Sequence, residues 1–157
     1  LLAAHFPASR FEKPDEAAIR SLAEEACAGK RSLAELAGAS IVAGLLAGLS
    51  PAQRDLLRRE APEQMRLSSG RVVRVRYESG KPPWIESRLQ DFFGITATPT
   101  VCAGKVPLTI HLLAPNGRAV QVTRDLAGFW ERHYPGIRRE LSRRYPKHAW
   151  PEDGRSR

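Results

Sequence analysis

The chain has 157 residues, of which 42% are hydrophobic, and its 25 lysines and arginines exceed its 17 aspartates and glutamates, giving a net charge of +8. This length suits one domain, or one domain with a helical appendage, and needs no disulfide or metal to build a core. The sequence lacks the long apolar run of a membrane span and the pattern of a secretory signal. Because it begins with Leu1 and its only methionine is Met65, we expect it to be a piece of a longer protein.

The chain opens on a stretch that predicts a small helical subdomain over residues 1–62. Asp15 can cap a helix that ends near Gly29. The apolar residues of that helix fall on one face at helical spacing: Ile19, Leu22, Ala23 and Ala26.

Two further helix starts follow within the same subdomain. The residues from Ser32 to Glu35 match a capping box, which predicts a second helix with a break near Gly38 and a continuation to about Gly48. Ser50, followed by a proline at the first helical position, predicts another helix, and Pro62 ends it.

The pattern then changes to period two, which is typical of a β-hairpin. Two runs of alternating residues flank a turn at 68–70. The hairpin should therefore have one apolar and one basic face. The apolar set is Met65, Leu67, Val73, Val75 and Tyr77, and the basic set is Arg66, Arg74 and Arg76.

A proline pair after Lys81 ends the hairpin and leads into a stretch that we interpret as a helix closed by Gly94. Its apolar stripe would comprise Ile85, Leu89, Phe92 and Phe93. We expect Trp84 to lie in the core, because it adjoins this stripe.

Strand signals return after Gly94. Residues 98–101 predict a short edge strand, and Leu108, Ile110 and Leu112 alternate with polar residues in a longer one. Residues 115–117 have the sequence of a hairpin turn, so the segment with Val120 and Val122 should form the returning strand.

Two helices and a tail should complete the chain. Thr123 or Asp125 caps a helix whose inward residues are Leu126, Phe129 and Trp130. Pro135 starts the last helix, with Ile137 and Leu141 inward and the arginines at 138, 139, 143 and 144 mostly outward. The aromatic residues of the tail at 145–151 either pack back onto the domain or stay available, and packing back is favoured.

These elements define the fold class as α+β: an N-terminal helical subdomain followed by a mainly antiparallel sheet flanked by helices. We expect domain boundaries at 1–62 for the helical subdomain, 63–153 for the α+β domain, and 154–157 for a tail.

The sequence contains no recognisable catalytic, nucleotide-binding or metal-binding motif. Neither GxxxxGK[ST] nor GxGxxG nor GxSxG occurs. The two cysteines, Cys27 and Cys102, and the four histidines match no zinc spacing. We therefore predict no catalytic residue, no metal and no cofactor in this chain. We expect Cys27 to be a buried thiol and the protein to reside in the reducing cytoplasm.

The positive charge is concentrated in two runs, one in the hairpin and one from the last helix onward. This distribution is typical of a surface that binds nucleic-acid backbone. A charged face that serves only solubility is the alternative for the hairpin. The candidate binding residues are Arg66, Arg74, Arg76, Lys81, Arg138, Arg139, Arg143, Arg144 and Lys147.

The chain resembles a known family, with looser agreement in its helical part. The segments LTIHLLAPNGRAVQVT, TRDLAGFW and RELSRRYPKHAWPED are similar to the C-terminal domain of HrpB-type bacterial ATP-dependent helicases of the DEAH-box group. RSLAEL, RVVRVRYESGKPPWIESRLQDFFG and TPTVCAGKVPL fit the same domain in the same order. The resemblance is tightest over residues 68–153.

The resemblance implies that this chain is an accessory module of an RNA or DNA helicase. In such helicases ATP and Mg²⁺ act in two RecA-like motor domains toward the N-terminus, whose motifs do not occur here. The expected partners are the helicase core of the same polypeptide and an RNA or DNA backbone, with no membrane and with a monomeric chain. The alternative is a protein-interaction or bracing module that packs on the helicase core without touching nucleic acid.

Overall fold

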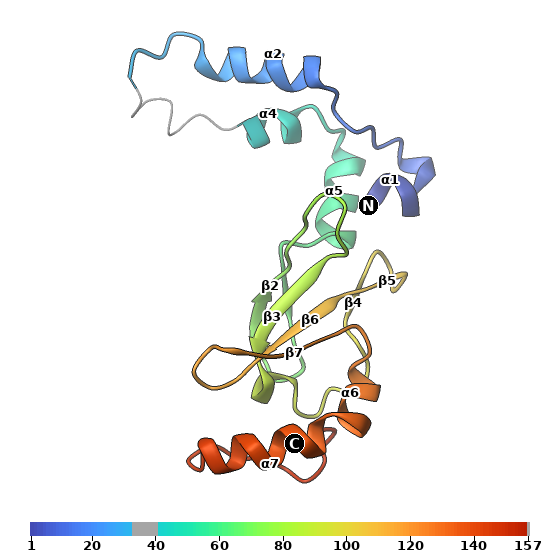
Figure 1. The fold of residues 1–157 in the computed structure, drawn as a ribbon. Coiled ribbons are helices and arrows are strands. Elements are labelled where there is room, and N and C mark those ends of the chain that lie inside the picture. Colours follow the sequence, from blue (N-terminus) through green and yellow to red (C-terminus); the bar gives the residue numbers. More distant parts are fainter. Residues whose placement is uncertain (33–40, 157) are drawn as a thin grey trace. The chain divides into compact units, whose positions relative to one another are not determined.

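The computed structural model describes residues 1–32 and 41–156, and it divides into two compact units (Figure 1). The N-terminal unit comprises Leu1–Ala61 and the C-terminal unit comprises Pro62–Arg157. Residues 33–40 lie outside the described residues, and with them all of the predicted second capping box after Ser32 and the predicted helix break near Gly38.

The N-terminal unit is entirely helical in its described part. Its elements are α1 (Leu2–His5), a 3₁₀ turn η1 (Pro7–Ser9), α2 (Glu16–Cys27), α4 (Ile41–Ala47) and α5 (Pro51–Glu60). Asp15 caps α2 by accepting a 2.7 Å hydrogen bond from the backbone N–H of Ala18, which confirms the predicted start. Ser50 and Gln53 form a reciprocal capping box at α5, which confirms that start too.

The prediction that Cys27 is buried is wrong. Cys27 is an exposed thiol at the end of α2. No residue of α2 or of α4 is buried, although the two helices lie against each other. Two helices that contact each other along one side cannot surround a residue at a helix end. Cys27 therefore remains exposed to solvent, although its sequence neighbours are apolar.

The C-terminal unit contains the strands. The predicted hairpin is confirmed as β1 (Gln64–Arg66) antiparallel to β2 (Val72–Arg74). A three-stranded sheet has the order β3-β6-β7, with β3 (Trp84–Arg88), β6 (Thr109–Leu113) and β7 (Ala119–Thr123). The short strands β4 (Thr100–Val101) and β5 (Val106–Pro107) form a separate antiparallel pair. The pairs are antiparallel except β3 with β6, which is parallel.

The predicted helix between Lys81 and Gly94 is wrong in its first half. Residues 84–88 form strand β3, and only η2 (Leu89–Phe92) is helical, as a 3₁₀ turn. In β3 the buried residues Ile85 and Ser87 alternate with exposed charged residues. The polar Ser87 conceals this period of two in the sequence, because its hydroxyl is buried in a hydrogen bond with the carboxylate of Asp91.

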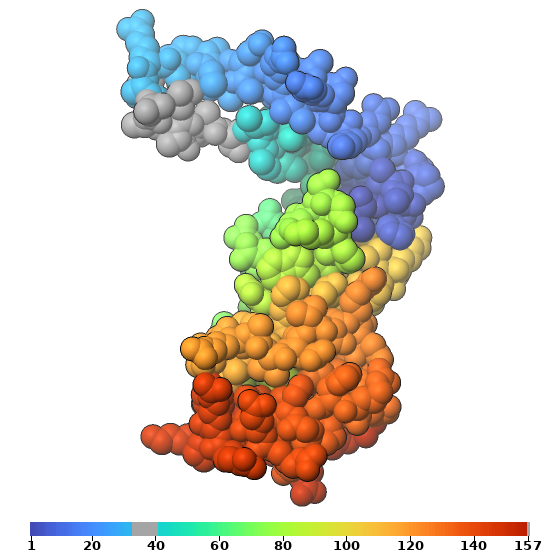
Figure 2. Space-filling model, viewed as in Figure 1, coloured from blue at the N-terminus to red at the C-terminus, as the bar shows by residue number. Residues whose placement is uncertain are grey.

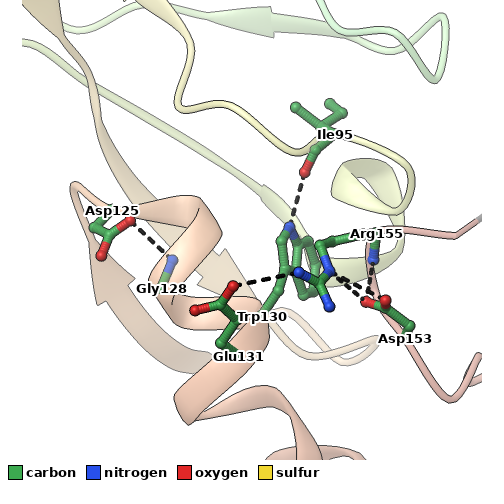
Figure 3. Close-up of polar contacts among 7 residues, drawn as sticks. All are labelled: Ile95, Asp125, Gly128, Trp130, Glu131, Asp153 and Arg155. Atoms are coloured by element: carbon green, nitrogen blue, oxygen red, sulfur yellow. Dashed lines mark hydrogen bonds and ion pairs between the residues drawn. The ribbon is translucent and has the colours of Figure 1, made fainter.

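The core of the C-terminal unit contains residues of the inner face of the sheet and of two helices, α6 (Leu126–Arg132) and α7 (Tyr134–Arg144). Asp125 caps α6 by accepting a hydrogen bond of 2.8 Å from the Gly128 N–H (Figure 3). The predicted core residues Phe93, Phe129 and Trp130 are confirmed as one cluster: the ring centroid of Trp130 lies 5.0 Å from that of Phe129 and 5.9 Å from that of Phe93. Among the described residues, the largest fully buried side chains are Ile85, Leu89, Phe92, Cys102, Leu108, Ile110, Leu112, Leu126, Phe129 and Tyr134.

The tail after α7 packs back onto the domain, as favoured from the sequence. The indole N–H of Trp150 donates a 3.0 Å hydrogen bond to the carbonyl of Tyr145, and its ring meets Phe93 edge-on at 6.3 Å. Gly154 is buried, so the packed structure extends past the boundary expected at 153. Within the described residues, the helices all lack the length and hydropathy needed to cross a membrane.

Candidate nucleic-acid interface

The β1–β2 hairpin sorts its residues onto two faces. The register pairs Gln64 with Arg74 and Arg66 with Val72, so these four side chains share one face. That face is exposed, whereas Val73 on the other face is buried. The predicted basic face is therefore confirmed, and the exposed Arg76 extends it two residues beyond Arg74.

The arginines of this basic face differ in their local partners. Arg66 donates a 3.0 Å hydrogen bond to the carbonyl of Gly70, and Arg76 lies 4.0 Å from the carboxylate of Glu86. Among the described residues, Arg74 has neither an ion pair nor a side-chain hydrogen bond. Together with Arg71, Arg74 and Arg76 line a shallow pocket of about 150 Å³ beside β3. The guanidinium of Arg74 is thus free to meet a phosphate.

Lys81 makes a local ion pair. Its ammonium lies 2.6 Å from a carboxylate oxygen of Glu78, and this hydrogen bond lowers the pKa of Glu78 below its usual value. Glu78 also accepts a hydrogen bond from the indole N–H of Trp84 at 3.3 Å. Lys81 would have to leave Glu78 in order to bind a phosphate.

Two arginines of α7 are bound to backbone carbonyls. Arg138 is half-buried and donates from Nε to the carbonyl of Trp150 at 3.1 Å, so it fastens the tail and does not point fully outward. Arg139 donates from Nε to the carbonyl of Pro135 at 3.3 Å but stays exposed. Arg138 is therefore a structural residue in this arrangement.

The other candidate cations of the second run, Arg143, Arg144 and Lys147, are exposed. Within the described part of the chain, Arg143 and Lys147 form no ion pair, and Arg144 lies 5.9 Å above the ring of Tyr145. Arg144 also lines a pocket of about 210 Å³ with Arg118 of the β6–β7 turn. In Figure 2 the red residues of α7 and the tail form one continuous area of the C-terminal unit.

The two basic runs belong to separate parts of the C-terminal unit. The hairpin packs along β3, whereas α7 packs against α6 (Figure 1). The sequence left open whether the runs form one surface, and this arrangement gives two separate candidates.

A pair of rings on the outward face of the sheet was not identified from the sequence as a binding feature. Trp84 is half-buried, so its predicted place in the core is wrong. Its ring stacks on His111 with 4.6 Å between centroids and 24° between planes, and the guanidinium of Arg76 lies 5.7 Å from its centroid. The alternation of Trp84 with Glu86 and Arg88 was the signal that could have placed it outward.

The structure shows no obvious catalytic or metal site in the part that it describes. Within residues 1–32 and 41–156, no group of three or more His, Cys, Asp or Glu side chains could hold a metal ion.

Comparisons with known proteins place this fold among helicases. The family described as ATP-dependent helicase C-terminal (HrpB_C) matches residues 23–154. Over 125 residues the chain is 37% identical to the "ATP-dependent RNA helicase HrpB" of Escherichia coli strain K12, covering 80% of this chain and 16% of that protein.

Two solved structures share the fold. The crystal structure of E. coli DExH-box NTPase HrpB has a TM-score of 0.88 and 31% identity, over 99% of this chain and 20% of that one. The crystal structure of E. coli DEAH/RHA helicase HrpB has a TM-score of 0.72 and 31% identity, over 95% of this chain and 19% of that one. The chain thus spans about a fifth or less of each of these relatives.

Proposed function

Because this chain belongs to the HrpB-type ATP-dependent helicase C-terminal family, we propose that it is an accessory module that binds nucleic-acid backbone for a helicase motor elsewhere in the polypeptide. The binding would not depend on sequence, and the nucleic acid would be RNA, since the curated relative is named an RNA helicase. The module would act as a monomer on the helicase core of its own polypeptide, in the cytoplasm.

The observation that carries this proposal is the basic face of the hairpin. Arg66 and Arg74 lie on one face of the hydrogen-bonded hairpin, and the exposed Arg76 follows Arg74 at the two-residue spacing of an extended chain. Guanidinium groups suit phosphate oxygens because their planar donors can bind two oxygens at once. Contacts to phosphates depend on the charge and spacing of the backbone and not on the bases, so they form with any nucleotide sequence.

The salt dependence of RNA binding tests this proposal. We compare the wild-type chain with an Arg66/Arg74/Arg76→Ala variant, using a single-stranded RNA. Removing one arginine that binds a phosphate should reduce the slope of log K against log salt by about 0.7. The variant should therefore bind more weakly at low salt, and its binding should depend less steeply on salt, with the magnitude of the slope reduced by up to about 2.

A matched control removes the same charge from exposed positions in the helices of the N-terminal unit, as Arg20/Arg54/Arg58→Ala. Its affinity should fall less than that of the hairpin variant, and its slope should stay closer to that of the wild type. Equally weakened binding by the two variants would show that only net charge matters. Absence of RNA binding by the wild-type chain would refute the proposal altogether.

A second candidate function is to brace the helicase core, and the N-terminal unit supports it. Four apolar residues of α2 and α4 are exposed there: Ile19 (42%), Ile41 (37%), Val42 (63%) and Leu46 (39%). Helices of 12 and 7 residues without a buried side chain need packing to be stable. A Val42→Asp variant should then bind the separately produced remainder of the helicase more weakly, whereas the hairpin variant should bind it as the wild type does.

We also propose that ATP and Mg²⁺ act only in the motor domains. The thermal unfolding midpoint of this chain should then be unchanged by ATP with Mg²⁺. A ligand at 100 times its dissociation constant would stabilise the chain by about 2.7 kcal/mol, a shift that a thermal scan would detect.

A further inference from the structure

Four side chains form a row across the outward face of the sheet. Arg76 forms a β-bridge with Trp84, the ring of Trp84 stacks on His111, and His111 pairs in register with Val122 of β7. We call these four residues the Trp84–His111 row. It lies opposite the core, because the residues between its members along β3 and β6, such as Ile85 and Ile110, are fully buried on the inner face.

The row is open at its β7 end. Trp84 covers the β3 side of the His111 ring, and among the described residues no other ring stacks on His111. The next side chain is Val122, which is 50% exposed on the strand at the free edge of the sheet. A flat, unsaturated group could therefore lie on His111 with Val122 as an apolar floor.

Cations flank the other end of the row. The segment from Arg71 to Arg88 contains five cations and two carboxylates. Both carboxylates are paired with cations, Glu78 with Lys81 at 2.6 Å and Glu86 with Arg76 at 4.0 Å. A polyanion that follows the hairpin thus meets a net positive surface, and its attached groups can reach the rings.

We infer that the Trp84–His111 row is a stacking site for an unpaired base of single-stranded RNA, with Arg74 and Arg76 holding the adjacent phosphates. This rests on the proposed binding of nucleic-acid backbone and adds that the substrate is single-stranded. Aromatic rings on a sheet accept any base, because every base has a π-face, but a base within a duplex already has both faces covered. Stacking therefore gives a preference for single strands without reading their sequence.

The experiment separates bases from phosphates. The probes are an oligouridine of about ten nucleotides, a strand with the same number of phosphates but without bases, and an RNA duplex. The variants are His111→Ala and His111→Phe, with Leu113→Ala as a control that truncates a half-buried side chain on the same strand. A thermal unfolding curve of each variant serves as the control that it remains folded.

Loss of one stacked base should weaken oligouridine binding by the His111→Ala variant about 5- to 150-fold. His111→Phe and Leu113→Ala should bind oligouridine much as the wild type does. All four proteins should bind the abasic strand equally, and the wild type should prefer oligouridine to the duplex at equal phosphate concentration.

Two results would overturn the inference in distinguishable ways. If the wild type binds oligouridine and the abasic strand equally, and His111→Ala changes neither, then phosphate binding stands and stacking is wrong. If no RNA binds at all, the proposed function fails and the stacking site fails with it; the row would then be available to a protein side chain.

Discussion

Gly154 lies against the indole ring of Trp130, so closely that a Cβ atom at position 154 would overlap the six-membered ring. The carbonyl of Gly154 accepts a 3.0 Å hydrogen bond from the backbone N–H of Gly94. Trp130 itself donates from its indole N–H to the carbonyl of Ile95 at 2.8 Å (Figure 3). The last residues of the chain therefore close the core around Trp130.

A methyl group at position 154 should destabilise the protein. Gly154→Ala forces either the indole or the tail to move, and overpacking of this kind costs about 1–3 kcal/mol. Urea unfolding measures the decrease directly. Gly136→Ala is the control, because nothing lies within 4 Å of a Cβ at that position of α7. In a helix, alanine is favoured over glycine by up to about 1 kcal/mol, so the control should leave the free energy of unfolding unchanged or raise it. Equal stabilities for the two variants would mean that the tail is not packed on Trp130.

Truncation of Trp130 should be among the most damaging core changes. The side chain is 3% exposed, and its ring contacts Phe93, Phe129 and Tyr134. We expect Trp130→Ala to lower the free energy of unfolding by about 3–5 kcal/mol. Trp130→Phe keeps an aromatic ring but leaves the carbonyl of Ile95 without its donor, so it should cost about 1–3 kcal/mol. A Phe variant as unstable as the Ala variant would assign the destabilisation to the hydrogen bond and not to packing.

The cap of α6 should make stability depend on acid pH. The hydrogen bond from the Gly128 N–H, and then the one from Arg132, lower the pKa of Asp125 below its usual 3.8. A carboxylate with a lowered folded pKa stabilises the protein above its unfolded pKa, and this contribution is lost as the pH falls through the folded value. Asp125→Asn keeps a capping oxygen without a titrating group. Its stability should therefore fall less steeply than that of the wild type between roughly pH 5 and pH 2. If the free energy of unfolding, measured with urea, falls equally with pH in both proteins across that range, this assignment is wrong.

Periodicity and capping residues predicted most elements of this fold. Asp15, Ser50 and Asp125 cap the helices that they were expected to start, and the hairpin follows the alternation around Val73. These signals are local, since a cap or an alternating run needs only its own neighbours to form. β3 was misread because its inner face carries the polar Ser87, and because its pairing with β6 is parallel and distant in sequence.

The candidate site was predictable in composition but not in geometry. The arginines of the hairpin could be read from the sequence, and the register then placed Arg66 and Arg74 on one face. The sequence could not show that Arg138 would bind the carbonyl of Trp150, because that interaction depends on where the tail returns. Nor could it bring Trp84 to His111, whose stacking requires the parallel pairing of β3 with β6.

Arg138 should matter for stability and not for RNA binding. Its Nε donates to the carbonyl of Trp150, a charge-assisted bond that holds the tail against α7. We expect Arg138→Ala to lower the free energy of unfolding by about 1.5–3 kcal/mol, and Arg138→Lys to restore little of it, because an ammonium cannot reproduce the Nε–H geometry. The exposed Arg143 is the control, and Arg143→Ala should change stability by less than about 0.5 kcal/mol. Urea unfolding and the salt slope of RNA binding are measured on the same proteins. If Arg138→Ala lowers the slope and Arg138→Lys restores it while stability stays constant, then Arg138 contacts phosphate and its bond to Trp150 is dispensable.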